Sequence, residues 1–355
     1  MKTVKYKLIV AVGLCGTVLL WISIYGDYDL TMPNYILKQN LTGNVPNDTL
    51  MNLQNFEYII NNASICSTTK GPKDSSAVIM VHSSRGNSEQ RYAIRNTWGS
   101  IKIFKKWHLH LVFLLGNDPL SSSETDAQII KESNEHGDMI IGNFIDSYHN
   151  LTYKHLMGYK WVSSFCPSAT FILKTDDDIF ADIFQVVEVI FVELMTTNNT
   201  YACLNMNGNK PIRDPKSKWY VSRDVYPIDT YPAFCSGSAY LVKAKDAKKI
   251  YDVSNSTKFF WIDDVFVTGI LRSKYGELAN DTVSGSLNIL YTMKRHHLSN
   301  KNEIIEWCKK GLLTTQLSFT FVLLTKNDFV SDMFCLWNKI RLMRYAMNAA
   351  VIEVK

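Results

Sequence analysis

Short apolar runs alternate with segments of helical spacing across the first half of this chain, and that alternation restricts the fold more than any other feature. The expected elements, in order, are residues 77–84 (strand), 88–99 (helix), 108–116 (strand), 121–136 (helix), 139–144 (strand), 151–165 (helix) and 170–180 (strand). Strands that alternate with helices predict an α/β fold, in which helices flank a mostly parallel sheet on both faces.

The second half of the chain is less regular. Residues 205–236 carry four prolines and predict an ordered loop with aromatic side chains, while 238–244 is a further strand candidate. Residues 259–276 begin extended and become helical. The apolar segment 312–324 has 13 residues, too few to cross a membrane, so we expect it to pack in the core or against the main domain.

Three consecutive aspartates, Asp176, Asp177 and Asp178, follow the fourth expected strand. Ligands of parallel α/β sheets bind at the carboxyl ends of the strands, which is where these residues fall. Adjacent carboxylates repel one another unless a cation neutralises them, and hard divalent cations prefer oxygen ligands. In an extended segment Asp176 and Asp178 share one face and Asp177 points elsewhere. The alternatives are a solvated acidic turn and a helix N-cap.

A second acidic pair, Asp263 and Asp264, follows three aromatic residues. Apolar rings desolvate a carboxylate and raise its pKa, which suits a general base. The alternative is an acidic pair that complements the dipole at a helix N-terminus.

Basic side chains supply two further candidates. Arg91 and Arg95 lie four residues apart, hence on one helix face, where they could bind a diphosphate or be solvated. His296 and His297 are candidates for completing a metal shell, or a structural pair.

The N-terminus predicts a membrane anchor. Three lysines precede the uncharged run 8–25, which is long enough to span a bilayer, and the positive charge on its short side predicts a type II orientation. A cleaved signal peptide is the alternative. The expected organisation is a cytoplasmic tail (1–7), transmembrane signal-anchor (8–25), lumenal stem (26–72), catalytic domain (73–310) and C-terminal extension (311–355).

Cysteines and sequons agree with a lumenal domain. Outside the anchor run there are six cysteines, which can form three disulfides in about 15 pairings. Seven Asn-x-Ser/Thr sequons occur, at Asn40, Asn47, Asn62, Asn150, Asn198, Asn255 and Asn280. The net charge is only +5 and the basic residues are scattered, so we expect no nucleic-acid partner.

Six segments, in order between about residues 78 and 307, resemble motifs of the β-1,3-galactosyltransferase and β-1,3-N-acetylglucosaminyltransferase family, which are Golgi type II enzymes. The segments are RYAIRNTWG (91–99), FLLG (113–116), GDMIIGNFIDSYHNLTYK (137–154), FILKTDDDIF (171–180), KWYVSRDVYPIDTYPAFCSGSAYLV (218–242) and IDDVFVTG (262–269). The resemblance implies a nucleotide-sugar-binding fold of the GT-A type.

It also implies roles for single residues. Asp176, Asp178 and His296 would contact Mn²⁺, and Asp176 and Asp177, together with Arg91 and Arg95, the UDP-sugar donor. Asp264 would be the catalytic base.

The implied reaction is inverting transfer of galactose or N-acetylglucosamine in β-1,3 linkage to an acceptor glycan on a glycoprotein or glycolipid, in the Golgi. The sequence departs from the family pattern where Asp263 replaces a glutamate, Thr268 is an extra residue before a glycine, and Asn143 replaces an aspartate. The alternatives are a fringe-like transferase acting on a protein-linked sugar, an inactive carbohydrate-binding relative, and a metal-dependent phosphohydrolase.

Overall fold

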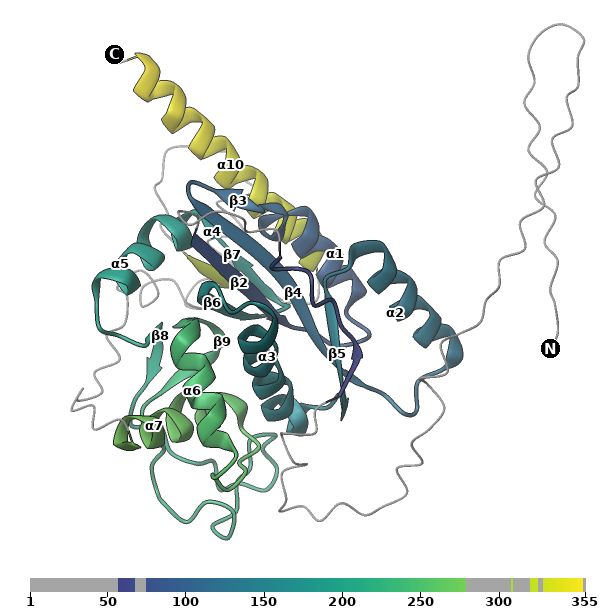
Figure 1. The fold of residues 1–355 in the computed structure, drawn as a ribbon, viewed down its shortest axis with the longest axis vertical. Helices are drawn as coiled ribbons and strands as arrows, with labels where there is room; N and C mark the ends of the chain where they lie inside the picture. The colour runs from purple at the N-terminus through teal and green to yellow at the C-terminus, as the bar shows by residue number, and fades with distance from the viewer. Residues whose placement is uncertain (1–56, 68–74, 279–307, 309–319, 325–327, 354–355) are drawn as a thin grey trace, which may run out of the picture. The chain divides into compact units, whose positions relative to one another are not determined.

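A computed structural model describes residues 57–67, 75–278, 308, 320–324 and 328–353, and these carry a mixed α/β architecture (Figure 1). The sheet order is β1-β5-β4-β2-β6-β9-β8, with β3 paired beside β4. Its strands are β1 (Tyr58–Ile60), β2 (Ser75–His82), β3 (Ile103–Phe104), β4 (Trp107–Asn117), β5 (Met139–Ile145), β6 (Ala169–Asp176), β8 (Tyr201–Met206) and β9 (Phe234–Lys243).

The four central strands, β5, β4, β2 and β6, run parallel, as the alternation of strands and helices predicts. The flanking pairings β1·β5, β3·β4, β6·β9 and β8·β9 are antiparallel. The expected mostly parallel sheet is therefore confirmed only for its centre. The edges differ because β9 returns beside β6 after the long loop 207–233 instead of through a crossover helix.

The helices cover both faces of the sheet. They are α1 (Ser88–Asn96), α2 (Ser123–His136), α3 (Leu151–Phe165), α4 (Ile183–Gln185), α5 (Phe191–Thr196), α6 (Ala244–Ser254), α7 (Arg272–Leu278) and α10 (Phe329–Glu353). Two π-helical turns, Val186–Ile190 and Val265–Leu271, lie between α4 and α5 and before α7. The bounds of α3 coincide with the expected helix.

Side chains of β2 alternate between two hydrophobic clusters, because successive residues of a strand point to opposite faces. Ala77, Ile79 and Val81 pack with α1, α2, α5 and α10, whereas Val78 and Met80 pack with α3 and α6. This two-sided burial explains why the central strands read as continuous apolar runs rather than alternating ones.

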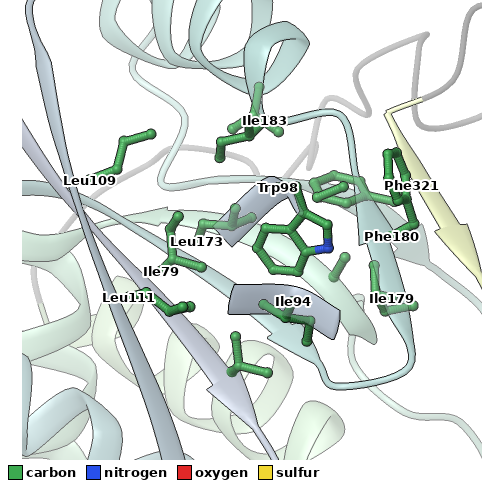
Figure 2. Close-up of a cluster of buried hydrophobic side chains, with 14 of the residues drawn as sticks. Ile79, Ile94, Trp98, Leu109, Leu111, Leu173, Ile179, Phe180, Ile183 and Phe321 are labelled. Atoms are coloured by element: carbon green, nitrogen blue, oxygen red, sulfur yellow. The ribbon is translucent and has the colours of Figure 1, made fainter. Parts of the chain in front are cut away.

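Segments expected outside the main domain belong to its main sheet or to its core, and one of them forms a separate two-stranded sheet. Residues 58–60, assigned above to the stem, form the edge strand β1 on β5. Beyond residue 311, β10 (Phe321–Leu323) pairs antiparallel with β7 (Ile179–Ala181), directly after the aspartate triplet. Figure 2 shows Trp98 beside Phe180 and Phe321 in one buried cluster. The C-terminal segment thus completes the core beneath the triplet, as expected of an apolar segment too short to span a membrane.

Three disulfides connect the six cysteines: Cys66–Cys166, Cys203–Cys235 and Cys308–Cys335. The anchor run 8–25 lies outside the described residues. Among the residues that are described, no helix combines the length and apolarity needed to cross a bilayer.

Candidate active site

The aspartate triplet lies at the carboxyl end of the parallel strands. Asp176 is the last residue of β6 and stands in register with His82, the last residue of β2. Asp177 and Asp178 form the turn into β7, and the backbone nitrogen of Leu324 in the C-terminal segment donates to the carbonyl of Asp178 at 2.8 Å. The turn is thus held from both sides, which fixes the directions of its side chains.

Asp177 faces the interior. Its backbone nitrogen donates to the carbonyl of His82 at 3.0 Å, and its Oδ2 accepts from Nδ2 of Asn87 at 2.9 Å. Burial raises the pKa of Asp177, while hydrogen bonds from Ser83 and Asn87 oppose that rise. Asp177 therefore connects the triplet to the loop before α1. Its expected contact with a UDP-sugar remains a prediction.

Asp176 and Asp178 have different surroundings. Nζ of Lys174 donates to Oδ1 of Asp176 at 2.6 Å. Desolvation raises the pKa of Asp176 to about 6 against the charge of Lys174, although 41% of the side chain is exposed. Oδ1 of Asp178 is buried without a hydrogen-bond partner among the described residues. Burial and the charges of Asp176 and Asp177 raise the pKa of Asp178 to about 7.

The unpartnered oxygen of Asp178 fits a hard divalent cation, because burying an unpaired carboxylate oxygen is costly and a cation removes both the desolvation and the repulsion. Within the described ranges, no three side chains of metal-ligating type converge on one point. Two carboxylates are nonetheless a usual protein share for Mg²⁺-like ions, whose remaining ligands are water and substrate phosphate. His296, the third expected ligand, lies outside the described residues.

The acidic pair Asp263–Asp264 directly precedes the π-helical turn Val265–Leu271, and Asp264 is the N-cap of that turn. Oδ2 of Asp264 accepts from the backbone nitrogen of Gly237 at 3.1 Å, and Oδ1 accepts from the nitrogen of Val265 at 2.8 Å. Burial and the charge of Asp263 raise the pKa of Asp264 to about 7. A carboxylate with a pKa near the working pH suits a general base.

Lys174 links the two acidic groups. Its buried ammonium contacts Asp176 on one side and the carbonyl of Gly237 on the other. Burial alone would lower the pKa of Lys174, but Asp176 and Asp263 hold it above its usual value, so the side chain stays charged. The apolar pattern of the strand did not predict this role of Lys174, because the role depends on contacts with residues that are distant in sequence.

The π-helical turn is fastened to the strand beside it. Oγ1 of the buried Thr268 donates to the carbonyl of Asp264 at 2.6 Å and accepts from the nitrogen of Cys235 at 2.9 Å. Cys235 is in turn bonded to Cys203 on β8. A π-helical turn accommodates one more residue than an α-helical turn, which matches the extra residue noted at Thr268.

Aromatic side chains from three loops lie near the aspartate triplet and the Asp263–Asp264 pair. Nε1 of Trp219 donates to Oη of Tyr148 at 2.6 Å, and the rings of His149 and Trp261 lie 4.4 Å apart. Tyr148 and Trp219 are 45% and 43% exposed. Besides burial, the charges of Asp263, Asp264 and Asp176 raise the pKa of Tyr148, which places this aromatic group within their field.

Arg91 and Arg95 share a helix face as expected, but carboxylates already occupy their guanidinium groups. Arg91 is fully buried and donates to Glu132 and to the 83–85 loop, and Arg95 donates to Glu132 and Asp138. The described geometry gives them a role in holding α1, α2 and that loop together. Direct contact with a nucleotide remains a prediction that these contacts do not support.

Comparison with known proteins places the same residues in a recognised family. The galactosyltransferase family model matches residues 89–279. β-1,3-Galactosyltransferase 5 of Pan paniscus is 42% identical over 190 residues, which are 54% of this chain and 62% of the relative. β-1,3-Galactosyltransferase 1 of Mus musculus is 36% identical over 240 residues, which are 67% of this chain and 71% of the relative. The chain thus spans less than two thirds of the first relative's length.

Solved structures resemble the chain only weakly. The bifunctional glycosyltransferase WbbM aligns with a TM-score of 0.31 and 10% identity, over 54% of this chain and 36% of that chain. A likeness of this size carries no conclusion about fold or activity.

Proposed function

Because this chain belongs to the galactosyltransferase family, we propose that it transfers a hexose from a UDP-sugar to a hydroxyl of an acceptor glycan, in β-1,3 linkage and with inversion. Galactose is the proposed hexose, since the relatives at 42% and 36% identity are both named β-1,3-galactosyltransferases. The fold is proposed to be of the GT-A type. The observation that carries the proposal is Asp264, a carboxylate with a pKa near 7 that Lys174 and Gly237 connect to the triplet.

The donor is proposed to bind over the triplet. Asp176 and Asp178 would hold Mn²⁺, which when bound neutralises charge on the diphosphate of the leaving UDP. The unpartnered Oδ1 of Asp178 and the raised pKa values of both carboxylates support this assignment. Asp177 supports the turn from within through Asn87.

Asp264 would act on the acceptor. Its carboxylate accepts the proton of the attacking hydroxyl while that oxygen forms a bond to the anomeric carbon. The bond from the anomeric carbon to the UDP oxygen breaks on the opposite side, and UDP leaves with the electron pair. One in-line displacement of this kind inverts the anomeric centre and needs no covalent enzyme intermediate. A positioned base of suitable pKa contributes about 10²–10⁴ in rate.

The acceptor is proposed to lie on the aromatic group of Tyr148, His149, Trp219 and Trp261. Exposed aromatic rings offer apolar faces to the C–H surfaces of a sugar, and the hydrogen bond between Trp219 and Tyr148 fixes two of the rings. Because Trp261 is two residues before Asp263, the same segment carries both a ring and the acidic pair.

We also propose a Golgi membrane location with a lumenal catalytic domain. The run 8–25 with its preceding lysines, the seven sequons and the three disulfides support it, since disulfides persist in oxidising compartments.

A donor panel tests the proposed function. The full chain is assayed with UDP-galactose, UDP-N-acetylglucosamine and UDP-N-acetylgalactosamine, with and without Mn²⁺ and acceptor glycan. We expect Mn²⁺-dependent transfer from UDP-galactose, with a β-1,3 linkage in the product's proton NMR spectrum. UDP release that needs no acceptor would indicate hydrolysis, and sugar binding without turnover with any donor would indicate a lectin-like protein. Either result contradicts the proposal.

A further inference from the structure

Asp263 ends a series of three hydrogen bonds that begins at the buried Tyr159. Oη of Tyr159 lies 2.8 Å from Oη of Tyr240, which contacts Nε2 of His155, and Nδ1 of His155 lies 2.9 Å from Oδ2 of Asp263. Tyr159, Tyr240 and His155 are fully buried. The proposed transfer reaction uses none of these three side chains.

The protons in this series can run in only one consistent direction when the imidazole is neutral. Since the carboxylate of Asp263 can only accept, Nδ1 of His155 must carry the proton and donate it. Nε2 is then an acceptor and receives the hydrogen of Tyr240, whose oxygen receives that of Tyr159. In this arrangement each of the four side chains in the series has a hydrogen-bond partner, as buried polar groups need.

The surroundings keep His155 neutral. Burial lowers its pKa and the charge of Lys174 on β6 lowers it further, while the bond to Asp263 opposes both. His82 on β2 packs edge-on against the same ring at 5.2 Å, and its own pKa is lowered well below the usual value by burial and by Lys174.

Asp263 is held as an anion next to the proposed base. Burial alone would raise the pKa of Asp263, but the hydrogen bond from His155 and the charge of Lys174 bring it below its usual value. The opposite holds for Asp264, where burial and the charge of Asp263 raise the pKa. Lys174 and the nitrogens of Val265 and Gly237 oppose that rise. Other titratable groups also interact with the pair: Asp176, Tyr148, Tyr231 and Tyr240.

We propose that His155 is a positioning residue. Its neutral imidazole accepts a hydrogen bond from Tyr240 and donates one to Asp263, and this bond keeps Asp263 charged beside Asp264. Two neighbouring carboxylates share one proton, and the better-solvated or better-bonded group stays ionised. His155 decides this competition, so that Asp264 is the group that exchanges the proton. The inference rests on the proposed role of Asp264 as the base.

The pH profile of kcat/KM tests it on the full chain with saturating Mn²⁺. In the wild type we expect an acid limb near pH 7, below which Asp264 is protonated. H155L removes the donor to Asp263, so that Asp263 takes part of the shared proton and Asp264 stays ionised at lower pH. The acid limb should move down by about one pH unit. H155N keeps an N–H near the Nδ1 position and should restore most of the wild-type limb.

Two further variants control for misfolding of H155L and for a general effect of replacing a buried histidine. Y240F removes one hydroxyl only and should shift the limb in the same direction by less, which covers the case in which H155L does not fold. H110N changes a buried histidine on β4 that takes no part in these hydrogen bonds, and should leave the acid limb in place. A rate loss in H155L and Y240F that is equal at every pH would overturn the inference.

A measurement without turnover separates this inference from the proposed function. In ¹⁵N spectra of histidine-labelled protein, His155 should remain neutral with its proton on Nδ1 from about pH 5.5 to 8. A proton on Nε2, or an imidazolium in that range, would overturn the inference even if transfer is observed. Absence of transfer by the wild type would overturn the proposed function whatever the spectra show.

Discussion

The backbone nitrogen of Gly237 donates to Oδ2 of Asp264 at 3.1 Å, and a Cβ at position 237 would lie 3.1 Å from Cβ of Asp264. Strand β9 and the start of the π-helical turn can approach this closely only because residue 237 has no side chain. The contact is one of two that fix the carboxylate of the proposed base.

G237A should therefore displace Asp264 by a few tenths of an ångström and lower kcat on the order of 10-fold, with little change in thermal stability. G276A is the matched control, because a Cβ there would meet nothing within 4 Å. It should leave kcat unchanged. Equal rates for G237A and G276A would show that the close approach does not position the base.

Thr268 offers a stability test of the same turn. T268V replaces the buried hydroxyl by a methyl group, which removes the bond to the carbonyl of Asp264 and leaves the nitrogen of Cys235 unpaired. We expect a loss of about 1–3 kcal/mol in the free energy of unfolding, measured by urea denaturation. T268S should recover most of it. T196V, at an exposed helix position, should cost less than about 0.5 kcal/mol, and a similar cost at both sites would contradict the assigned bonds.

Lys154 makes a buried ion pair at the carboxyl edge of the sheet. Its Nζ lies 2.6 Å from Oδ1 of Asp146 and 2.6 Å from the carbonyl of Ser83. K154M removes the cation from Asp146, whose other oxygen still accepts from the nitrogen of Gly116, and the loss of this buried ion pair should destabilise the protein by about 3–5 kcal/mol. The exposed pair Lys248–Asp252 is the control, where K248M should cost less than about 0.5 kcal/mol. An equal loss of stability in K154M and K248M would contradict a stabilising role for the buried ion pair.

Much of the fold follows from the spacing of apolar residues. The centre of the sheet, the position of α3 and the place of the triplet at a strand end all agree with that pattern. The central strands are buried on both faces, and ten of the 15 residues of α3 are buried. The edge strands β1 (Tyr58–Ile60) and β8 (Tyr201–Met206) have only three and six residues, too few for a periodic pattern, so that pairing with neighbours determines them.

The site could be predicted from the sequence only in part, for a similar reason. Helical spacing places Arg91 and Arg95 on one face, but it cannot show that Glu132 and Asp138 meet them. His155 and Asp263 are separated by 108 residues in sequence, and nothing near either residue identifies the other. Local sequence thus locates the acidic groups, whereas the contacts that tune them are long-range.

The raised pKa of Asp178 makes stability depend on pH in the metal-free protein. Its folded-state pKa is about 7, above the usual value for the unfolded chain, so that the folded protein binds a proton more tightly. Stability is then greatest below about pH 4 as far as this group is concerned, and is lost as pH rises toward 7. D178N removes the charge and should raise the melting temperature of the metal-free protein at pH 7.5, whereas D252N at an exposed site should not.

Mn²⁺ should stabilise the wild type more than D178N. Binding to the folded wild type adds about 2.7 kcal/mol of stability at 100 times Kd, while D178N lacks the carboxylate and should gain little. Melting curves with and without Mn²⁺ check both parts. An equal gain in wild type and D178N would remove Asp178 from the metal site.

The role of Asp264 is tested most directly by comparing D264N with the wild type at saturating UDP-galactose, acceptor and Mn²⁺. D264N keeps the size of the side chain and can still accept from one of the two nitrogens, that of Gly237 or that of Val265, but it cannot take a proton. We predict that kcat falls by about 10²–10⁴, while the Kd of UDP measured by calorimetry is unchanged. Transfer by D264N at close to the wild-type rate would contradict the assignment of Asp264 as the base.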